Sequence, residues 1–317
     1  MKGIIALSLG DYKTGWPLFE LLNQRSDAKK FGMDRYPDTP MWNGQRTDET
    51  VLIWCSMGLG DMLMMWRYLP YIEALAPNII LETHSELFRL ALDNEMAPEI
   101  VSLKEHNKYF KYHWPLMSSP YLFDTTLDTI LPSPYLRAKP RENYKGPKLG
   151  LFCQSIPPPG MLSDESLVRN LDQPAVDRLC ERYKFIALHQ ADLKTFDMLE
   201  TARYIKALDL VVTTDSAVAH LCGALGKKTF LMLPVKCCWR WLRGRSDSPW
   251  YSSIRIFRQK TPRDWGPVID EVLQALDEEG IDNSFLGETL QEKVNGVPYN
   301  EVVSIPRTTK ALGRSFP

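Results

Sequence analysis

The sequence predicts an α/β protein of two lobes, each built around a parallel sheet. Short apolar runs alternate with segments of helical periodicity between residues 50 and 93, and again between 148 and 233. Strand and helix alternating in this way are typical of parallel sheets covered by helices. A charged stretch near residue 145 separates the two series, so we expect the sheets to face a central cleft. At 317 residues the chain is long enough for two domains with separate cores.

The first lobe is expected over residues 50–146, behind a helical remnant and linker at 1–49. Large apolar residues between Leu7 and Leu22 recur at helical spacing around a turn at Gly10, which predicts a helical hairpin. The elements predicted after it are a strand at 51–55, a helix at 62–75, a strand at 78–83, a helix at 86–93 and loops over 104–147.

The second lobe is expected over residues 147–280, with a C-terminal extension at 281–317. Its predicted elements are strands at 148–153, 185–188, 209–213 and 228–233 and helices at 174–183, 196–207, 217–225 and 266–278. Ligands of such sheets bind at the carboxyl ends of the strands, so the residues that follow each strand are the candidate site residues.

Composition and charge exclude several classes of protein. Hydrophobic residues make up 44% of the chain and charged residues 24%, as in globular proteins. The net charge of −1 provides no global attraction to nucleic acid or anionic lipid. No run approaches the roughly 20 apolar residues of a membrane span, and the first apolar stretch is a poor signal peptide. The six cysteines show neither a disulfide framework nor zinc-ligand spacing. We therefore expect a cytoplasmic protein with free thiols, without a membrane span or a metal site.

The turn after the first predicted strand carries the first candidate residues. Gly58 and Gly60 permit a tight turn and a close approach of the backbone to a ligand. The pattern is not a dinucleotide fingerprint, because Leu63 occupies the position of the third glycine. Asp61 suits a general base that takes a proton from an attacking hydroxyl. The alternative is a structural turn in which this aspartate caps the next helix.

The segment from Thr214 to His220 carries the second group. Asp215 or Ser216 can cap a helix that begins near Ala217, and the free N–H groups of that helix can bind phosphate oxygens. His220 lies one turn into the helix and can face the same anion. The alternative is an ordinary capping motif with a histidine packed against the sheet.

A loop rich in arginine and tryptophan follows the last predicted strand. Arginine binds diphosphates through its fork of N–H groups, and aromatic rings stack on bases or sugars. In the alternative, the tryptophans pin the loop to the sheet and the arginines pair with Asp247 and Asp264. The alternation also resembles a nucleic-acid surface. The residues concerned are Trp239, Arg240, Trp241, Arg243 and Arg245.

These blocks together resemble a known family. Residues 207–226, followed by Trp239-Arg240-Trp241, residues 247–251 and Phe257-Arg258-Gln259, are similar to the glycosyltransferase domain that often follows tetratricopeptide repeats in bacterial proteins. That domain is a heptosyltransferase-like relative of glycosyltransferase family 9. The resemblance runs from about Leu7 to Trp265, and few repeat residues remain, so we expect the domain without its repeats.

The resemblance implies a GT-B fold of two Rossmann-like lobes, in which the C-terminal lobe holds the donor. It also implies metal-independent transfer, usually with inversion, and no cofactor. By analogy, Asp61 matches the base, and Asp215, Ser216 and His220 match the motif that holds the donor's nucleotide and diphosphate. Gly58, Gly60 and Ala217 line the same donor side. To these we add Arg240 as a diphosphate clamp, Arg169 as a weaker one, and Trp239 and Trp241 as stacking platforms.

The expected activity is therefore transfer of a hexose or pentose from a nucleotide-diphosphate donor to an acceptor hydroxyl. The acceptor stays open among a hydroxylated base in DNA, for a virus-encoded enzyme acting in the host cytoplasm, a surface glycan and a protein. A basic surface formed by Arg67, Arg240, Arg243 and Arg245 would favour DNA. The alternatives are an inactive nucleotide-sugar-binding module and a sugar-nucleotide epimerase of the same fold. We expect a monomer or a weak dimer.

Overall fold

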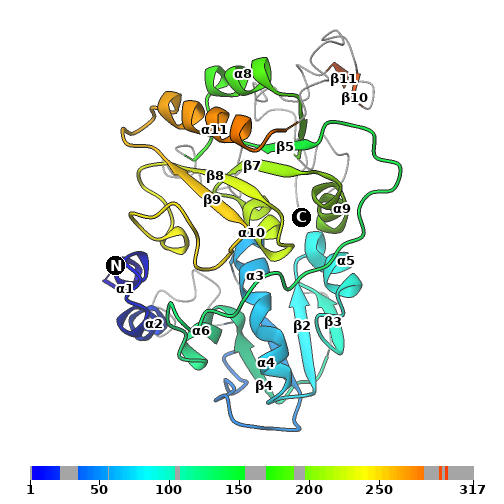
Figure 1. The fold of residues 1–317 in the computed structure, drawn as a ribbon. Helices are drawn as coiled ribbons and strands as arrows, with labels where there is room; N and C mark the ends of the chain where they lie inside the picture. The colour runs from blue at the N-terminus through cyan, green and yellow to red at the C-terminus, as the bar shows by residue number, and fades with distance from the viewer. Residues whose placement is uncertain are drawn as a thin grey trace, which may run out of the picture.

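Two all-parallel sheets form two lobes in the computed structural model, one above the other in Figure 1. The structure describes residues 2–21, 35–55, 57–103, 108–153, 169–188 and 197–281, together with a short antiparallel strand pair, β10 (Lys293–Val294) and β11 (Val297–Pro298). The predicted α/β class and two-lobe architecture are confirmed. Most of the C-terminal extension lies outside the described residues. Within the described part of the chain, no helix combines the length and apolarity that crossing a membrane requires.

The first lobe has a four-stranded sheet in the order β3-β2-β1-β4. Its strands are β1 (Val51–Trp54), β2 (Ile79–Thr83), β3 (Glu99–Ser102) and β4 (Tyr112–Pro115). Its helices are α3 (Leu59–Met65), η2 (Trp66–Tyr68), α4 (Leu69–Glu73), α5 (Ser85–Asp93), η3 (Leu116–Ser118) and α6 (Ser119–Leu122). The helix predicted over 62–75 is divided by the 3-10 turn η2. Pro70 has no N–H for a continuous helix, and the chain tightens so that Leu69 N–H donates to Trp66 O instead.

The prediction of loops over 104–147 is wrong at residues 112–122, which form the edge strand β4 and the short helices η3 and α6. This strand pairs with β1 in the register Val51↔Tyr112. Its sequence, Tyr-His-Trp-Pro, is not an aliphatic run, and the proline is tolerated because β4 lies at the edge of the sheet. Sequence reasoning also missed β3 and the edge strand β9 (Ile254–Arg258) of the second lobe.

The second lobe has a five-stranded sheet in the order β6-β5-β7-β8-β9. The other strands are β5 (Leu149–Phe152), β6 (Phe185–Ala187), β7 (Leu210–Thr214) and β8 (Thr229–Leu233). The helices are α8 (Gln173–Arg182), α9 (Met198–Ala207), α10 (Ala217–Ala224), η4 (Trp239–Trp241) and α11 (Gly266–Glu278). Helices α8 and α11 cover one face of this sheet, and α9 and α10 lie on the face toward the first lobe (Figure 1).

One hydrophobic core runs through both lobes where α3 meets α10. Met62 to Met65 on α3 and Val218 to Ala224 on α10 are buried and belong to the same cluster of side chains. Both helices begin directly after a buried strand, β1 or β7. The carboxyl ends of these two strands therefore meet at the junction of the lobes.

A helical hairpin at the N-terminus packs against both lobes. Helices α1 (Lys2–Ser8) and α2 (Tyr12–Glu20) form it, and the Asp11 side chain caps α2 by accepting from Thr14 N at 3.1 Å. Trp16 donates to Thr125 O of the first lobe at 3.0 Å and meets Trp239 of the second lobe edge-on, with ring centroids 5.2 Å apart. The hairpin thus ties η4 to the rest of the molecule.

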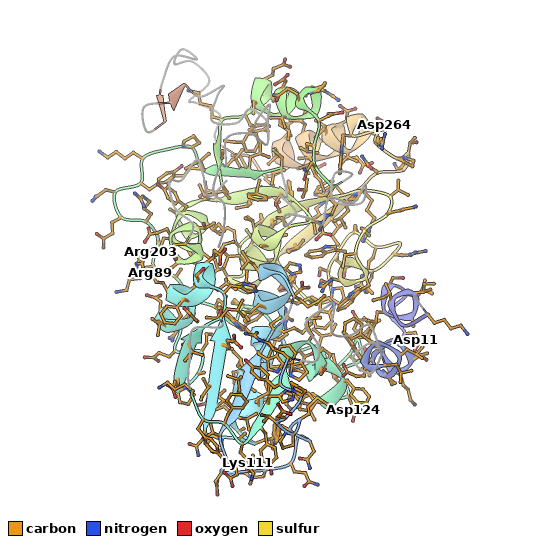
Figure 2. The ribbon with its side chains drawn as sticks, turned by 180° about the vertical axis from the view of Figure 1, so that it is seen from behind. Asp11, Arg89, Lys111, Asp124, Arg203 and Asp264 are labelled. Carbon is orange, nitrogen blue, oxygen red and sulfur yellow. The ribbon has the colours of Figure 1, made fainter. Side chains whose placement is uncertain are left out.

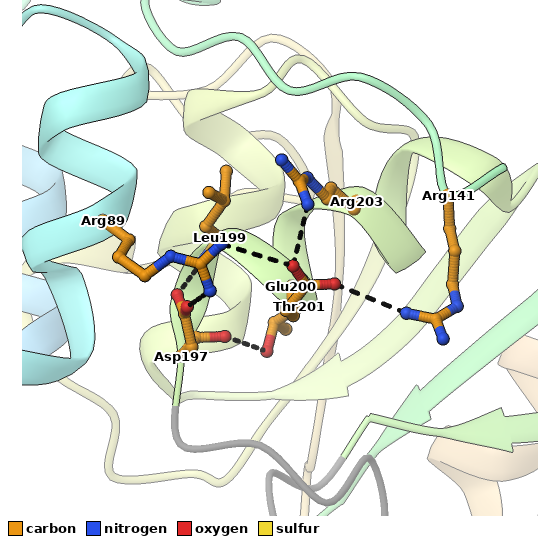
Figure 3. Close-up of polar contacts among 7 residues, drawn as sticks. All are labelled: Arg89, Arg141, Asp197, Leu199, Glu200, Thr201 and Arg203. Atoms are coloured by element: carbon orange, nitrogen blue, oxygen red, sulfur yellow. Dashed lines mark hydrogen bonds and ion pairs between the residues drawn. The ribbon is translucent and has the colours of Figure 1, made fainter.

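A cluster of charges joins the lobes at the opposite side (Figures 2 and 3). Arg89 of α5 pairs with Asp197, the N-cap of α9, and lies 3.9 Å from Glu200. Glu200 also accepts from Arg203 at 2.8 Å and from Arg141 at 3.4 Å. The arginine side chains are between 33% and 56% exposed, so each pair contributes only about 0–1 kcal/mol.

Candidate functional site

The N-terminal turn of α3 presents Asp61 to the second lobe. Gly58 is the N-cap with an extended backbone, and its N–H donates to Asp61 Oδ2 at 3.0 Å. One carboxylate oxygen of Asp61 therefore caps α3, as the structural alternative expected. The other oxygen, Oδ1, forms an ion pair with Arg240, which is 179 positions away in the sequence. The aspartate thus combines a local cap with a contact between the lobes.

Arg240 projects from η4 into this junction. Its Nη1 donates to Cys238 Sγ at 2.7 Å, and its guanidinium lies 4.6 Å from the centre of the Trp239 ring. Burial by itself would lower the pKa of Arg240, but Asp61, Cys238 and Asp215 together outweigh burial and raise that pKa above its ordinary value. The guanidinium is therefore a fixed cation, and its Nε finds no hydrogen-bond partner within the described segments.

The segment from Thr214 to His220 closes the site from the second lobe. Ser216 is the N-cap of α10, and its Oγ accepts from Ala219 N at 3.4 Å. Asp215 Oδ1 accepts from Trp241 Nε1 at 2.8 Å, and Arg169 Nη1 lies 3.6 Å from Asp215 Oδ2. The structure therefore brings Arg169 to the predicted motif, although most of the loop 155–170 lies outside the described residues.

His220 is buried beneath this turn, as the packing alternative expected. Its ring stacks on Trp241 with centroids 5.0 Å apart, and Nδ1 lies 2.9 Å from the Tyr251 hydroxyl. Burial, with the charges of Arg240 and Arg67, holds the pKa of His220 well below its usual range. The imidazole is therefore neutral at pH 7 and carries one ring proton.

Gly60 allows the two lobes to approach at this point. A Cβ at this position would lie 2.7 Å from His220 Cδ2 and 3.4 Å from Ala217 Cα. Any side chain would therefore separate α3 from α10. Because of this contact, residues predicted from two distant segments, Gly58 to Asp61 and Asp215 to His220, occupy one site.

Three buried polar atoms at the junction have no hydrogen-bond partner among the residues that the structure describes. They are Thr214 Oγ1, Arg240 Nε and Asp215 Oδ2, the last of which keeps its 3.6 Å ion pair with Arg169. Buried polar groups are normally satisfied, so unpaired ones at the carboxyl end of a strand indicate a place for a polar ligand or water. In the described part of the chain, no three His, Cys, Asp or Glu side chains gather as metal ligands would.

The tryptophans of the loop differ from the expectation. Trp239 is 4% exposed and Trp241 is fully buried. Trp239 packs against Trp16 and Arg240, and Trp241 against His220 and Tyr251. Their rings are occupied by protein, so neither offers a free face to a base or sugar in this structure. They pin the loop, as the alternative reading expected.

The expected basic surface does not form either. Arg67 is buried at the junction, Arg245 pairs with Asp247 at 2.6 Å, and Arg243 is exposed on the loop. Of the four arginines, only Arg240 contacts a predicted catalytic residue. Asp264 binds the backbone N–H of Gly266 at 3.2 Å, so the expected pairing with an arginine of the loop is seen only at Asp247.

Tyr251, to which sequence reasoning gave no role, and Arg67, which it placed on a basic surface, complete the site. Tyr251 contacts His220, and Arg67 contacts the carbonyl of Trp250. Tyr251 belongs to a block that carries the family resemblance, Asp247 to Tyr251, and this was the available signal for it. Their roles depend on contacts across the lobes, which no local pattern reveals.

The chain resembles several known proteins. No family model matches it. A curated relative is Protein FlbA of Caulobacter vibrioides, 26% identical over 87% of this chain and 54% of the relative, so the chain spans about half the length of the protein it matches. Among solved structures it resembles Escherichia coli ADP-heptose LPS heptosyltransferase II, with 11% identity and a TM-score of 0.49 over 73% of this chain and 99% of the other.

Two further solved structures are similar at the same level. A family 9 glycosyltransferase from Veillonella parvula has 11% identity and a TM-score of 0.46 over 82% of this chain and 96% of the other. The iron-containing dodecameric glycosyltransferase TibC of enterotoxigenic E. coli has 12% identity and a TM-score of 0.49, over 74% and 78%. At these values the architecture rests on the strand order and register described above.

Proposed function

We propose that this protein is a glycosyltransferase that moves a sugar from a nucleotide-diphosphate donor to an acceptor hydroxyl without a metal ion. The observation that carries the proposal is the meeting of Asp61 with Arg240 beside the start of α10. A carboxylate, a fixed cation and the N-terminus of a helix converge there from different lobes. This combination suits a reaction in which a hydroxyl loses a proton while a diphosphate leaves.

Each group has a role in an in-line displacement. Asp61 removes the proton of the acceptor hydroxyl, whose oxygen attacks the anomeric carbon. The bond from that carbon to the diphosphate breaks on the opposite face, so the configuration inverts. The N–H groups at the start of α10, with His220 and Arg240, stabilise the charge that develops on the leaving diphosphate. Arg169 lies 3.6 Å from Asp215 Oδ2, where it suits a second contact with the nucleotide.

Arg240 links the donor to the base. In this structure its guanidinium pairs with Asp61. A diphosphate at the start of α10 would compete for the same guanidinium and would leave Asp61 Oδ1 available to the acceptor. Donor binding would therefore precede productive acceptor binding.

A thermal-shift screen of nucleoside diphosphates and nucleotide sugars tests the donor. A ligand at about 100 times its Kd stabilises the native state by about 2.7 kcal/mol, which raises the melting temperature by several degrees. Asp61→Asn should keep this shift and lose transfer, whereas an inactive binding module would show the shift without transfer in either form. An epimerase would convert the donor alone, without acceptor. If no donor shifts the melting temperature or is consumed, the proposal fails.

The acceptor follows from the identified donor. Hydroxylated DNA bases, glycans and proteins are the classes to test. The burial of Arg67 and the pairing of Arg245 with Asp247 remove two of the cations that would attract DNA, which favours glycans or proteins.

A further inference from the structure

The proton on the buried His220 ring has two possible positions. The neutral imidazole carries it either on Nδ1 or on Nε2, and the hydrogen bond at the other nitrogen decides which. Nδ1 lies 2.9 Å from the hydroxyl of Tyr251, so one of these two groups donates to the other. The assignment therefore depends on where the Tyr251 proton goes.

The surroundings of Tyr251 favour donation from the phenol to His220. Tyr251 is fully buried, its hydroxyl lies 2.9 Å from Nδ1 of His220, and the side chains of Arg67 and Tyr135 also interact with that hydroxyl. The guanidinium of Arg67 lies 4.9 Å from the centre of the phenol ring and can donate hydrogen bonds but cannot accept them. If Nδ1 carried the proton, the phenol oxygen would have to accept it beside the Arg67 guanidinium. The phenol would then have to give its own proton to the Tyr135 oxygen, which Arg67 Nη2 also approaches at 3.4 Å. This competition for acceptor lone pairs favours the arrangement in which the phenol donates to His220.

Tyr135 is the other hydroxyl near this group. It donates its proton to Leu63 O at 2.8 Å, and its oxygen lies 3.4 Å from Nη2 of Arg67. It would accept from Tyr251 only if that phenol turned its proton away from His220. The two arrangements predict opposite tautomers of His220.

The other edge of the imidazole faces the first lobe. The place where Gly60 lacks a Cβ is 3.5 Å from His220 Nε2, so this nitrogen borders the turn that carries Asp61. Stacking on Trp241 holds the plane of the His220 ring, and Trp241 itself donates a hydrogen bond to Asp215. A proton on Nε2 would therefore point into the junction between the lobes.

Arg67 holds Tyr251 in place from the first lobe. Its Nε donates to Met64 O at 2.9 Å, and its Nη1 donates to Leu131 O at 2.8 Å and to Trp250 O at 3.0 Å. The guanidinium also lies against the rings of Tyr135, Trp250 and Tyr251, with its central carbon about 5 Å from each ring centre. It thereby fixes the backbone on which Tyr251 stands.

We propose that Tyr251, held by Arg67, is a positioning residue that keeps His220 as the Nε2–H tautomer and so makes the ring a hydrogen-bond donor to a phosphate oxygen of the donor. The assignment of the tautomer is independent of the proposed function. The role of His220 as a hydrogen-bond donor to phosphate rests on the proposed function. A neutral donor of this kind stabilises the leaving diphosphate without adding a titrating charge.

Nitrogen-15 NMR of histidine-labelled protein tests the tautomer directly. In a neutral imidazole, the nitrogen that carries a proton and the nitrogen that does not have widely separated nitrogen-15 chemical shifts. The chain has only five histidines, so the signals that disappear in His220→Gln are those of His220. We expect wild-type protein to show protonated Nε2 and bare Nδ1. Tyr251→Phe should keep the packing and lose this pattern, giving mixed tautomers. A wild-type signal with the proton on Nδ1 overturns the proposal.

Tyr68→Phe is the matched control, because it also removes one buried hydroxyl. That hydroxyl forms a hydrogen bond of 2.8 Å with Thr125 Oγ1 and does not contact His220. Both variants should lose similar stability, but only Tyr251→Phe should change the His220 signal. Once a donor is known, Tyr251→Phe should lower kcat by roughly 10- to 100-fold with little change in KM. An unchanged kcat would overturn the role toward phosphate, whereas absence of any donor would count against the proposed function and leave the tautomer standing.

Discussion

Gly60→Ala tests the contact that brings the two lobes together. The added Cβ would lie 2.7 Å from His220 Cδ2. The imidazole ring is held in place because Trp241 stacks on it and the Tyr251 hydroxyl forms a hydrogen bond with it. Overpacking of this kind costs about 1–3 kcal/mol. Replacing a helical glycine by alanine returns about 1 kcal/mol of intrinsic helix stability. The net loss in the wild-type background is therefore about 0–2 kcal/mol.

A double-mutant cycle separates these two terms. In a His220→Ala background the overlap is gone, so Gly60→Ala should stabilise the protein by up to about 1 kcal/mol. The coupling between the two sites should then be about 1–3 kcal/mol. Urea unfolding followed by tryptophan fluorescence measures all four proteins. Gly58→Ala is a control, since its Cβ would meet nothing closer than Asp61 Oδ2 at 3.6 Å. A Gly60→Ala effect that is the same in both backgrounds would refute the close approach of α3 and α10.

Three further measurements test the charges of the molecule. Below about pH 6.5 the free energy of unfolding should fall by up to about 1.4 kcal/mol per pH unit for each of His113 and His220. Burial lowers both folded-state pKa values, so the unfolded chain binds more protons there. Urea midpoints at pH 7 and 5.5 check this. If His220→Gln leaves the pH dependence of the free energy of unfolding unchanged, the prediction is contradicted. Arg240→Met should cost about 2–4 kcal/mol because it strands Asp61 in the junction, and adding Asp61→Asn should recover part of the loss. No recovery in that cycle would exclude the pair as the cause. Arg89→Gln should cost less than about 1 kcal/mol and nothing at high salt, and a larger, salt-independent loss would mean that packing dominates there.

Local sequence signals predicted where the two helices of the candidate site begin. The glycine turn before Asp61 and the cap at Ser216 were predicted from residues within one helical turn, and both caps are present in the structure. Helix α11 was predicted with the bounds that the structure shows. These features depend on periodicity and on backbone groups a few residues away, which the sequence displays directly.

The edge strands show where local signals end. Tyr112 to Pro115 and Ile254 to Arg258 lack the long aliphatic runs of the central strands, since an edge strand has one neighbour and less buried surface. Pairing with β1 and β8 makes them strands. Tertiary context therefore overrides their weak intrinsic preference.

By itself, the sequence determined the order of the central strands and of the main helices, the caps at which α3 and α10 begin, and which residue types stand at the carboxyl ends of β1 and β7. Only the tertiary structure decided that Asp61 meets Arg240, that the loop tryptophans are buried, and that Tyr251 reaches His220. The physical reason is range. A cap forms with backbone three residues away, whereas an ion pair spanning 179 positions exists only after the two lobes have packed.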